Sequence, residues 1–329
     1  MDRWSGILKA PLYPNSTPHC RVAASLCLSS SSKTVTVPSV NAIFFSGDRV
    51  EGTGNPVIER LSNLERIAEI LVSKLGGSIN AWVIEASTFN GPFAVYKDFI
   101  PSVNHWGEPK VYNPAGFPAS TSTISLLSNC FKEVKQIISG SQKEQYQTGV
   151  SASCLCTPKT FIFGFSKGGT VLNQLMTELS ISEIKSTENP INASEQLFSG
   201  GPVNGQEENP IVPSSVDGFL NSIAEIHYVD VGLNSTGAYL TDSDVIERIS
   251  KRLMEGEGGI RVVLHGTPRQ WCDSRRVLIR NEKDKLVQLL ESGAQRSGGK
   301  LHVCERFYFA DKPPSLQMHF EIIENLNVH

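Results

Sequence analysis

Segments with a strand pattern and segments with a helix pattern alternate along nearly the whole chain. Short apolar runs such as Asn41–Asp48 and Ile79–Ser87 are typical of buried strands. After the first of these runs, apolar residues recur three or four positions apart, as at Leu64, Ile67 and Leu71, which is typical of one face of a helix. Such alternation predicts an α/β fold, in which a mainly parallel sheet is covered by helices on both faces.

The alternation continues through the second half of the chain and is interrupted twice. Further strands are expected at Glu225–Gly232, Ile260–Gly266 and Lys300–Phe309. The stretches 139–158 and 182–216 are rich in Ser, Asn, Gly, Pro and Glu and hold few apolar residues, so they are expected to be loop insertions. We therefore expect one domain over residues 41–329, with two inserted loops.

The first forty residues allow two interpretations. Their basic residues stand against a single acid, Asp2, and the segment is rich in serine, which is typical of an organelle transit peptide. The β-prone stretches Arg21–Leu28 and Lys33–Val37 are also separated by a serine-rich turn, which is typical of a β-hairpin. Residues 1–40 are thus expected to be either a targeting segment or a hairpin of the fold, and both interpretations stay open.

Charge and cysteine content exclude several classes of function. The formal net charge is −3 and the charged residues are scattered, which argues against a nucleic-acid partner. No apolar run reaches the roughly 18 residues of a membrane-spanning helix. The seven cysteines have no zinc-ligand spacing, and the chain has no nucleotide-binding glycine motif, so no metal and no cofactor are expected.

The pentapeptide Gly164-Phe165-Ser166-Lys167-Gly168 lies between a predicted strand and a predicted helix. A nucleophile elbow needs this context, because the serine stands on a tight turn where bulky neighbours would clash. Gly164 and Gly168 occupy the positions two before and two after Ser166. The backbone N–H of Lys167 could then donate to an oxyanion. The alternative interpretation is a structural turn.

A nucleophilic serine needs a base and an acid, and the expected chain order is Ser, Asp, His. His319 lies just beyond the last predicted strand, where the base is expected, although a structural loop histidine is the alternative. Asp273 follows the penultimate strand, which is the usual place of the acid. Asp230 ends the strand before that one and is the alternative acid.

A second oxyanion donor is expected after an early strand. The sequence Phe-Phe-Ser-Gly-Asp places Gly47 and Asp48 there. Gly47 lets the backbone approach the serine closely, and Asp48 could orient the loop. A simple turn is the alternative.

With these motifs in hand, the chain resembles an uncharacterised eukaryotic family that looks like an α/β-hydrolase and whose human member is a chromosome 2 open-reading-frame product. The resemblance runs from about Asn41 to the C-terminus through FFSGD, GFSKGGTVLNQL, DVG, HGTPRQWCD and PPSLQMHF. The middle residue of DVG departs from the family's Asp-Gly-Gly. The resemblance implies an α/β-hydrolase-like fold, a mitochondrial location and a serine-hydrolase activity, with Ser166, Asp273, His319, Asp230 and Gly47 on matching positions. The alternative location is cytoplasmic.

The combined expectation is a serine hydrolase that cleaves an ester, thioester or amide. Ser166 would be the nucleophile, His319 the base and Asp273 the acid. The substrate would be a small-molecule or lipid-like acyl compound, and the sequence does not indicate a protein partner. The alternative is a hydrolase fold that has become a binding or scaffolding protein without turnover.

Overall fold

A computed structural model describes residues 2–13, 19–140, 157–182 and 211–328. The expected insertions, 139–158 and 182–216, therefore lie largely outside the described residues. Among these residues, no helix has the length and apolar character that crossing a membrane requires.

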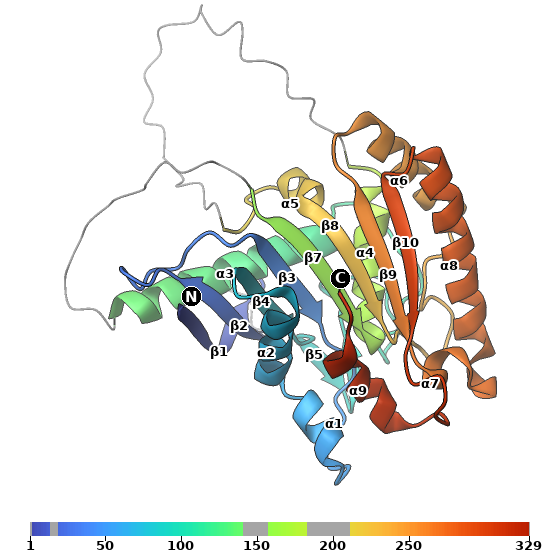
Figure 1. Cartoon of the computed structure of the whole chain (residues 1–329), viewed down its shortest axis with the longest axis horizontal. Helices are drawn as coiled ribbons and strands as arrows, with labels where there is room; N and C mark the ends of the chain where they lie inside the picture. Colours follow the sequence, from blue (N-terminus) through green and yellow to red (C-terminus); the bar gives the residue numbers. More distant parts are fainter. Residues whose placement is uncertain (1, 14–18, 141–156, 183–210, 329) are drawn as a thin grey trace, which may run out of the picture.

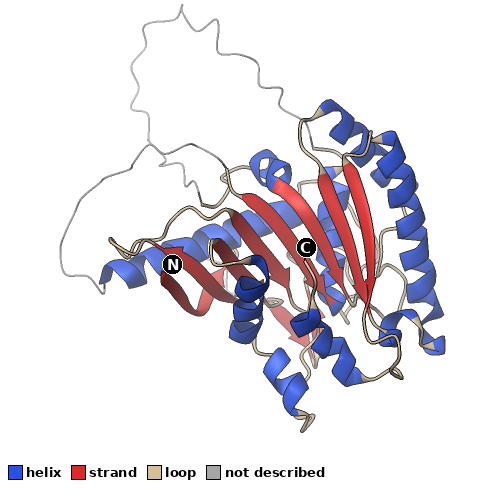
Figure 2. Cartoon of the chain, in the orientation of Figure 1, coloured by secondary structure: helices blue, strands red, loops and turns tan. Residues whose placement is uncertain are grey.

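Eight strands form one twisted sheet, drawn in red in Figure 2. Their spatial order is β1 (Asp2–Pro11), β2 (His19–Leu28), β4 (Ile79–Ile84), β3 (Val40–Phe45), β7 (Lys159–Phe165), β8 (Ile223–Val229), β9 (Ile260–Gly266) and β10 (Leu301–Phe307). In this order, the six strands from β4 to β10 are parallel to one another. Strand β2 is antiparallel to both of its neighbours, β1 and β4. A separate small hairpin joins β5 (Thr88–Asn90) and β6 (Phe93–Val95). The mainly parallel sheet confirms the expected α/β-hydrolase-like fold.

Helices cover both faces of the sheet (Figure 1). One face carries α1 (Pro56–Leu61), α2 (Leu64–Leu75) and α9 (Leu316–Asn325). The other carries α3 (Pro118–Gly140), α4 (Gly169–Leu179), α5 (Val216–Ser222), α6 (Ser243–Glu255) and α8 (Val277–Arg296). A hydrophobic core lies on each face of the sheet, and successive side chains of β3 point into them alternately. Ile43 and Phe45 pack into one core, and Ala42 and Phe44 pack into the other. This alternation explains why the strand is apolar throughout.

The N-terminal segment forms an antiparallel hairpin within the main sheet. Its strands are β1 and β2, and β2 continues the sheet by pairing with β4. The expected second strand, Lys33–Val37, contributes only an isolated bridge between Leu28 and Val35. The expected hairpin joined Arg21–Leu28 to Lys33–Val37, whereas the observed hairpin joins β2 to the preceding strand, β1, along the whole length of both.

The carboxyl ends of the parallel strands meet at one edge, toward which the arrowheads of β7, β8 and β9 point in Figure 1. The short elements η1 (Ser166–Gly168), α7 (Pro268–Trp271) and η2 (Ser274–Arg276) lie directly after these strands. Ligands of open α/β sheets bind at this edge. The sequence-predicted site residues Gly47, Ser166 and Asp230 all follow strand ends there.

Candidate active site

Ser166 stands on a tight turn between β7 and α4. It is the first residue of η1, and its φ is +53°, an angle that residues other than glycine adopt rarely. The preceding residue Phe165 ends the strand, and α4 starts at Gly169. The strand, turn and helix thus follow one another as the nucleophile-elbow pattern requires.

The glycines around Ser166 are needed because other backbone lies against them. A Cβ on Gly168 would come within 2.1 Å of the carbonyl oxygen of Phe45, and one on Gly164 within 2.7 Å of the Gly169 Cα. A Cβ on Gly169 would meet the side chain of Val231 at 2.3 Å. The turn can therefore pack tightly against the ends of both neighbouring strands only with glycine at these positions.

His319 and Asp230 form a short hydrogen bond. Nδ1 of His319 lies 2.6 Å from Oδ2 of Asp230, and both side chains are buried. Thr267 holds the carboxylate from the next strand end, because its backbone N–H donates to Oδ1 at 2.8 Å and its hydroxyl donates to Oδ2 at 3.1 Å. The φ of Asp230 is +44°, so it shares the rare backbone conformation of Ser166. The alternative acid, Asp230, is therefore the carboxylate that contacts the imidazole.

The expected placement of Asp273 beside His319 is wrong. Asp273 caps η2 and accepts hydrogen bonds from the side chain of Arg275 at 3.1 and 2.9 Å. These bonds from Arg275 lower the pKa of Asp273 to about 2. The loop after β9 turns into α7 before Asp273 is reached, so this carboxylate faces an exposed arginine and not the histidine.

No hydrogen bond joins Ser166 and His319 in the described structure. The ring of Phe165, the residue before the serine, lies 4.6 Å from the imidazole, centroid to centroid. Catalytic hydrogen bonds are often long before substrate binds. The structure thus brings His319 and Asp230 together, and Ser166 and Asp230 directly follow the paired strand residues Phe165 and Val229.

The loop after β3 approaches Ser166 through Gly47. A Cβ on Gly47 would lie 2.6 Å from the Cβ of Ser166 and 3.1 Å from its Oγ, so only glycine allows this approach. Behind the loop lies a cavity of about 130 Å³. Phe165 and Phe320 line it together with Gly47, and Ser166 does not.

The side chain of Lys167 ties the elbow to that loop. Its Nζ lies 2.9 Å from Oδ1 of Asp48 and donates to the carbonyl oxygen of Trp106 at 2.7 Å. The same Asp48 oxygen accepts the backbone N–H of Ala94 at 2.7 Å. This ion pair between buried Lys167 and partly exposed Asp48 was not predicted from the sequence, because nothing local indicates that Lys167 turns inward.

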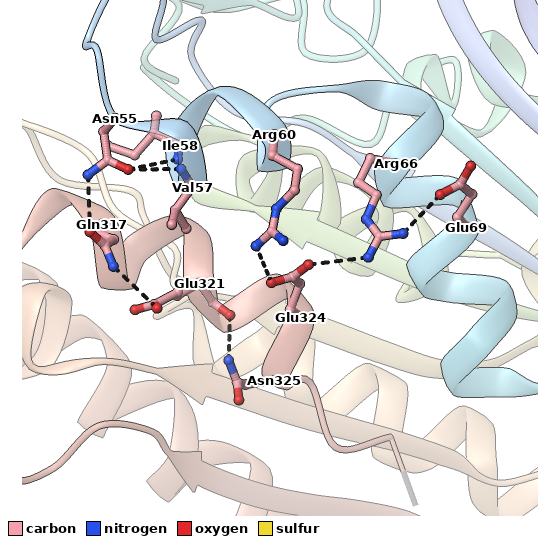
Figure 3. Close-up of polar contacts among 10 residues, drawn as sticks. All are labelled: Asn55, Val57, Ile58, Arg60, Arg66, Glu69, Gln317, Glu321, Glu324 and Asn325. Atoms are coloured by element: carbon pink, nitrogen blue, oxygen red, sulfur yellow. Dashed lines mark hydrogen bonds and ion pairs between the residues drawn. The ribbon is translucent and has the colours of Figure 1, made fainter.

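Helix α9, which carries His319, is fastened to α1 and α2 by polar contacts (Figure 3). Glu324 accepts from Arg60 at 2.7 Å and from Arg66 at 3.4 Å. At the other end, the amide of Asn55, which caps α1, donates to Gln317 at 3.0 Å. These contacts, with Phe320 packed on Phe165, fix the helix over the end of β7.

The roles of Asp48 and Thr267 had weak signals in the sequence. Thr267 precedes Pro268, which is a common helix start, and this explains its cap position but not its bonds to Asp230. In the described ranges, no cluster of three or more His, Cys, Asp or Glu side chains is suited to a metal ion.

A sequence model of the C2orf69 family matches residues 115–294, a little over half of the chain. The chain belongs to the C2orf69 family. It is 26% identical over 329 residues to the human mitochondrial protein C2orf69, covering 87% of this chain and 74% of the human one. It is 28% identical over 297 residues to the mouse homolog, covering 80% and 69%. Both relatives are named as mitochondrial proteins, which confirms the expected mitochondrial location.

Solved structures with a similar chain trace include hydrolases. The siderophore hydrolase EstA from Aspergillus nidulans has a TM-score of 0.45 at 11% identity and covers 99% of this chain and 95% of its own. A ferulic acid esterase has a TM-score of 0.46 at 12% identity and covers 99% and 96%. At these scores the likenesses say nothing about the activity of this C2orf69 family member.

Proposed function

We propose that this chain is a serine hydrolase in which Ser166, His319 and Asp230 act together. The observation that carries the proposal is the 2.6 Å hydrogen bond between His319 and buried Asp230, beside a serine held at a φ of +53°. The carboxylate fixes the tautomer of the imidazole with its proton on Nδ1 and stabilises the imidazolium that forms during the reaction.

In the proposed reaction, Oγ of Ser166 attacks the carbonyl carbon of an ester, thioester or amide, and its proton passes to Nε2 of His319. The oxyanion accepts hydrogen bonds from the backbone N–H of Lys167 and from the loop at Gly47. When the tetrahedral intermediate collapses, the bond to the leaving group breaks and His319 protonates that group. Water then attacks the acyl-serine through the same base and frees the acid.

A scaffolding protein without turnover is the second candidate, and one observation favours it: Ser166 and His319 share no hydrogen bond in the described structure. Fold alone does not establish activity. The two candidates differ in whether Ser166 is reactive.

The test is labelling with a fluorophosphonate, which reacts with activated serines. We expect the wild-type chain to be labelled and Ser166→Ala to lose labelling entirely, while Ser243→Ala, a change at an exposed position on α6, labels as the wild type does. Labelling of Ser166→Ala at the wild-type rate would place the nucleophile elsewhere. A wild-type chain that stays unlabelled would support the scaffold.

A further inference from the structure

Helix α7 carries a half-buried arginine next to the candidate site. Pro268, Gln270 and Trp271 are buried, and Arg269 is the one residue of the helix that is not. The helix contacts both β9 and α9, the helix of His319. Its capping residue, Thr267, is the one that donates two hydrogen bonds to Asp230.

The guanidinium of Arg269 has no partner among the described residues. Its Nε is shielded from solvent and makes no hydrogen bond, and no ion pair or hydrogen bond joins its other nitrogens to the described chain. Leaving a buried donor unsatisfied costs free energy, and more when the donor is charged. The burial of Arg269, reinforced by the charge of Arg276, lowers its pKa, whereas the charge of Asp230 raises it.

Other cations in this part of the molecule have hydrogen-bond acceptors or ion-pair partners. Arg275 is paired with Asp273 at 2.9 Å, and Arg276 donates to Oε1 of Gln270 at 3.1 Å. The buried Lys167 has Asp48 and the carbonyl of Trp106. Of these four cations, Arg269 is thus the one whose side chain the described residues leave without an acceptor.

We propose that Arg269 binds an anionic oxygen group of the substrate, a carboxylate or a phosphate, at the acyl end that His319 and Ser166 process. The proposal rests on the proposed hydrolase function. A guanidinium presents a planar fork of N–H donors that fits either group with two hydrogen bonds. The substrate class would be acyl esters or thioesters that carry a negative charge.

Arg269 could instead act on the site by stabilising the charge of Asp230. The two roles differ in what the arginine recognises. A substrate contact affects only substrates that carry the anion, whereas an effect through Asp230 slows every substrate alike.

The test compares three 4-nitrophenyl esters of matched length: the neutral butanoate, the monosuccinate and the 3-phosphonopropanoate. We expect Arg269→Gln to reduce kcat/KM for the anionic esters by about 10-fold to 100-fold more than for the neutral one, mainly through KM, as loss of a charged hydrogen bond implies. Arg269→Lys should retain part of the preference, because it keeps the charge without the fork. Whichever anionic ester loses more identifies the group as carboxylate or phosphate.

Arg275→Gln is the matched control, because Arg275 is exposed and already paired with Asp273, and it should leave the ratio of anionic to neutral turnover unchanged. Thermal midpoints of all variants exclude misfolding as the cause. If Arg269→Gln lowers kcat/KM equally for all three esters, or leaves kcat/KM for all of them unchanged, this inference is overturned and the proposed hydrolase function is not. Failure of the wild-type chain to hydrolyse any ester, with Ser166 unlabelled, would instead overturn the hydrolase function and this inference with it.

Discussion

Ser166 and Asp230 end neighbouring strands and share a positive φ, +53° and +44°. Such a conformation costs roughly 1–3 kcal/mol for a residue other than glycine and persists only where the surrounding structure enforces it. The bonds from Thr267 enforce it at Asp230, and the close packing of Gly168 on Phe45 enforces it at the serine. Strain of this kind is concentrated at functional sites, so two such residues side by side support the proposed pairing of nucleophile and acid.

Two asparagine variants test which carboxylate is the acid. Asp230→Asn keeps the shape but favours the wrong tautomer of His319, so we expect fluorophosphonate labelling to slow on the order of 10⁴-fold, the cost of that change in a serine protease. Asp273→Asn should label at the wild-type rate, because it removes only the pairing with Arg275. Labelling rates are measured with thermal midpoints as a check on folding. If Asp273→Asn is folded but labels slowly, while Asp230→Asn labels at the wild-type rate, the assignment of Asp230 as the acid would be refuted.

The tight turn at Ser166 could be predicted from the sequence because its signal is local: glycines at fixed offsets from Ser166 lie between a strand and a helix. Which carboxylate contacts His319 could not be decided in the same way. Asp230 and Asp273 both follow strands and both precede His319, and the choice depends on where the chain turns after β9. That turn is set by Thr267 and the tertiary contacts of α7, which no local pattern records.

At the scale of elements, the turn at Ser166 depends on glycine more than on any side-chain contact. We expect Gly168→Ala to destabilise the fold by more than about 4 kcal/mol, the range reached by severe overpacking and strain, because the new Cβ would lie 2.1 Å from the carbonyl of Phe45. The control is Gly258→Ala, where a Cβ meets nothing within 4 Å. Urea unfolding measures both. Equal stability of the two variants would show that the backbone can move aside.

Most parallel strands were predictable because they are continuous apolar runs buried on both faces, as β4 is along its whole length. Strand β1 was missed as a strand because its exposed residues interrupt the apolar pattern, and its pairing with β2 is what defines it. The hairpin of β5 and β6 is only three residues to a strand and gives no periodicity to detect.

At the scale of the whole molecule, a buried histidine pair links β8 and β9. Nδ1 of His227 lies 3.0 Å from Nε2 of His265, Glu225 lies 2.8 Å from the outer nitrogen of His227, and the hydroxyl of Tyr308 lies 2.8 Å from that of His265. Burial lowers the pKa of both histidines below the ordinary 6.5. The charges of Arg261 and Arg306 act in the same direction.

This pair predicts a loss of stability in mild acid. In the unfolded chain both histidines take up protons below about pH 6.5, whereas in the folded chain they stay neutral until the pH reaches their lower folded pKa values. Stability is therefore full above pH 6.5 and is lost as the pH falls from 6.5 toward the folded pKa values. Each site changes the free energy of unfolding by at most about 1.4 kcal/mol per pH unit.

The measurement is urea unfolding at pH 7 and pH 5. We expect His265→Gln to lose less stability between the two values than the wild-type chain does. His302→Gln, at an exposed position on β10, is the control and should show the wild-type difference. An unchanged difference in His265→Gln would mean that other groups set the acid response.

Two described residues that border undescribed stretches, Thr157 and Ile211, lie away from the candidate site. The site lies at the carboxyl ends of β3, β7 and β8, whereas Thr157 leads into the amino end of β7. Ile211 lies at the amino end of β3, where its carbonyl accepts from Asn41 at 2.7 Å. Thr157 and Ile211 therefore lie at the edge of the sheet opposite the site.

The position of His319 on the last described helix has a genetic consequence. Strand β10 ends at Phe307, so a stop codon between Phe307 and His319 would leave every strand of the main sheet encoded. The shortened product would nevertheless lack His319, the proposed base, and Phe320, which packs on Phe165 at the end of β7. Nonsense alleles in this stretch are therefore expected to behave as complete loss-of-function alleles, although they leave the whole sheet encoded.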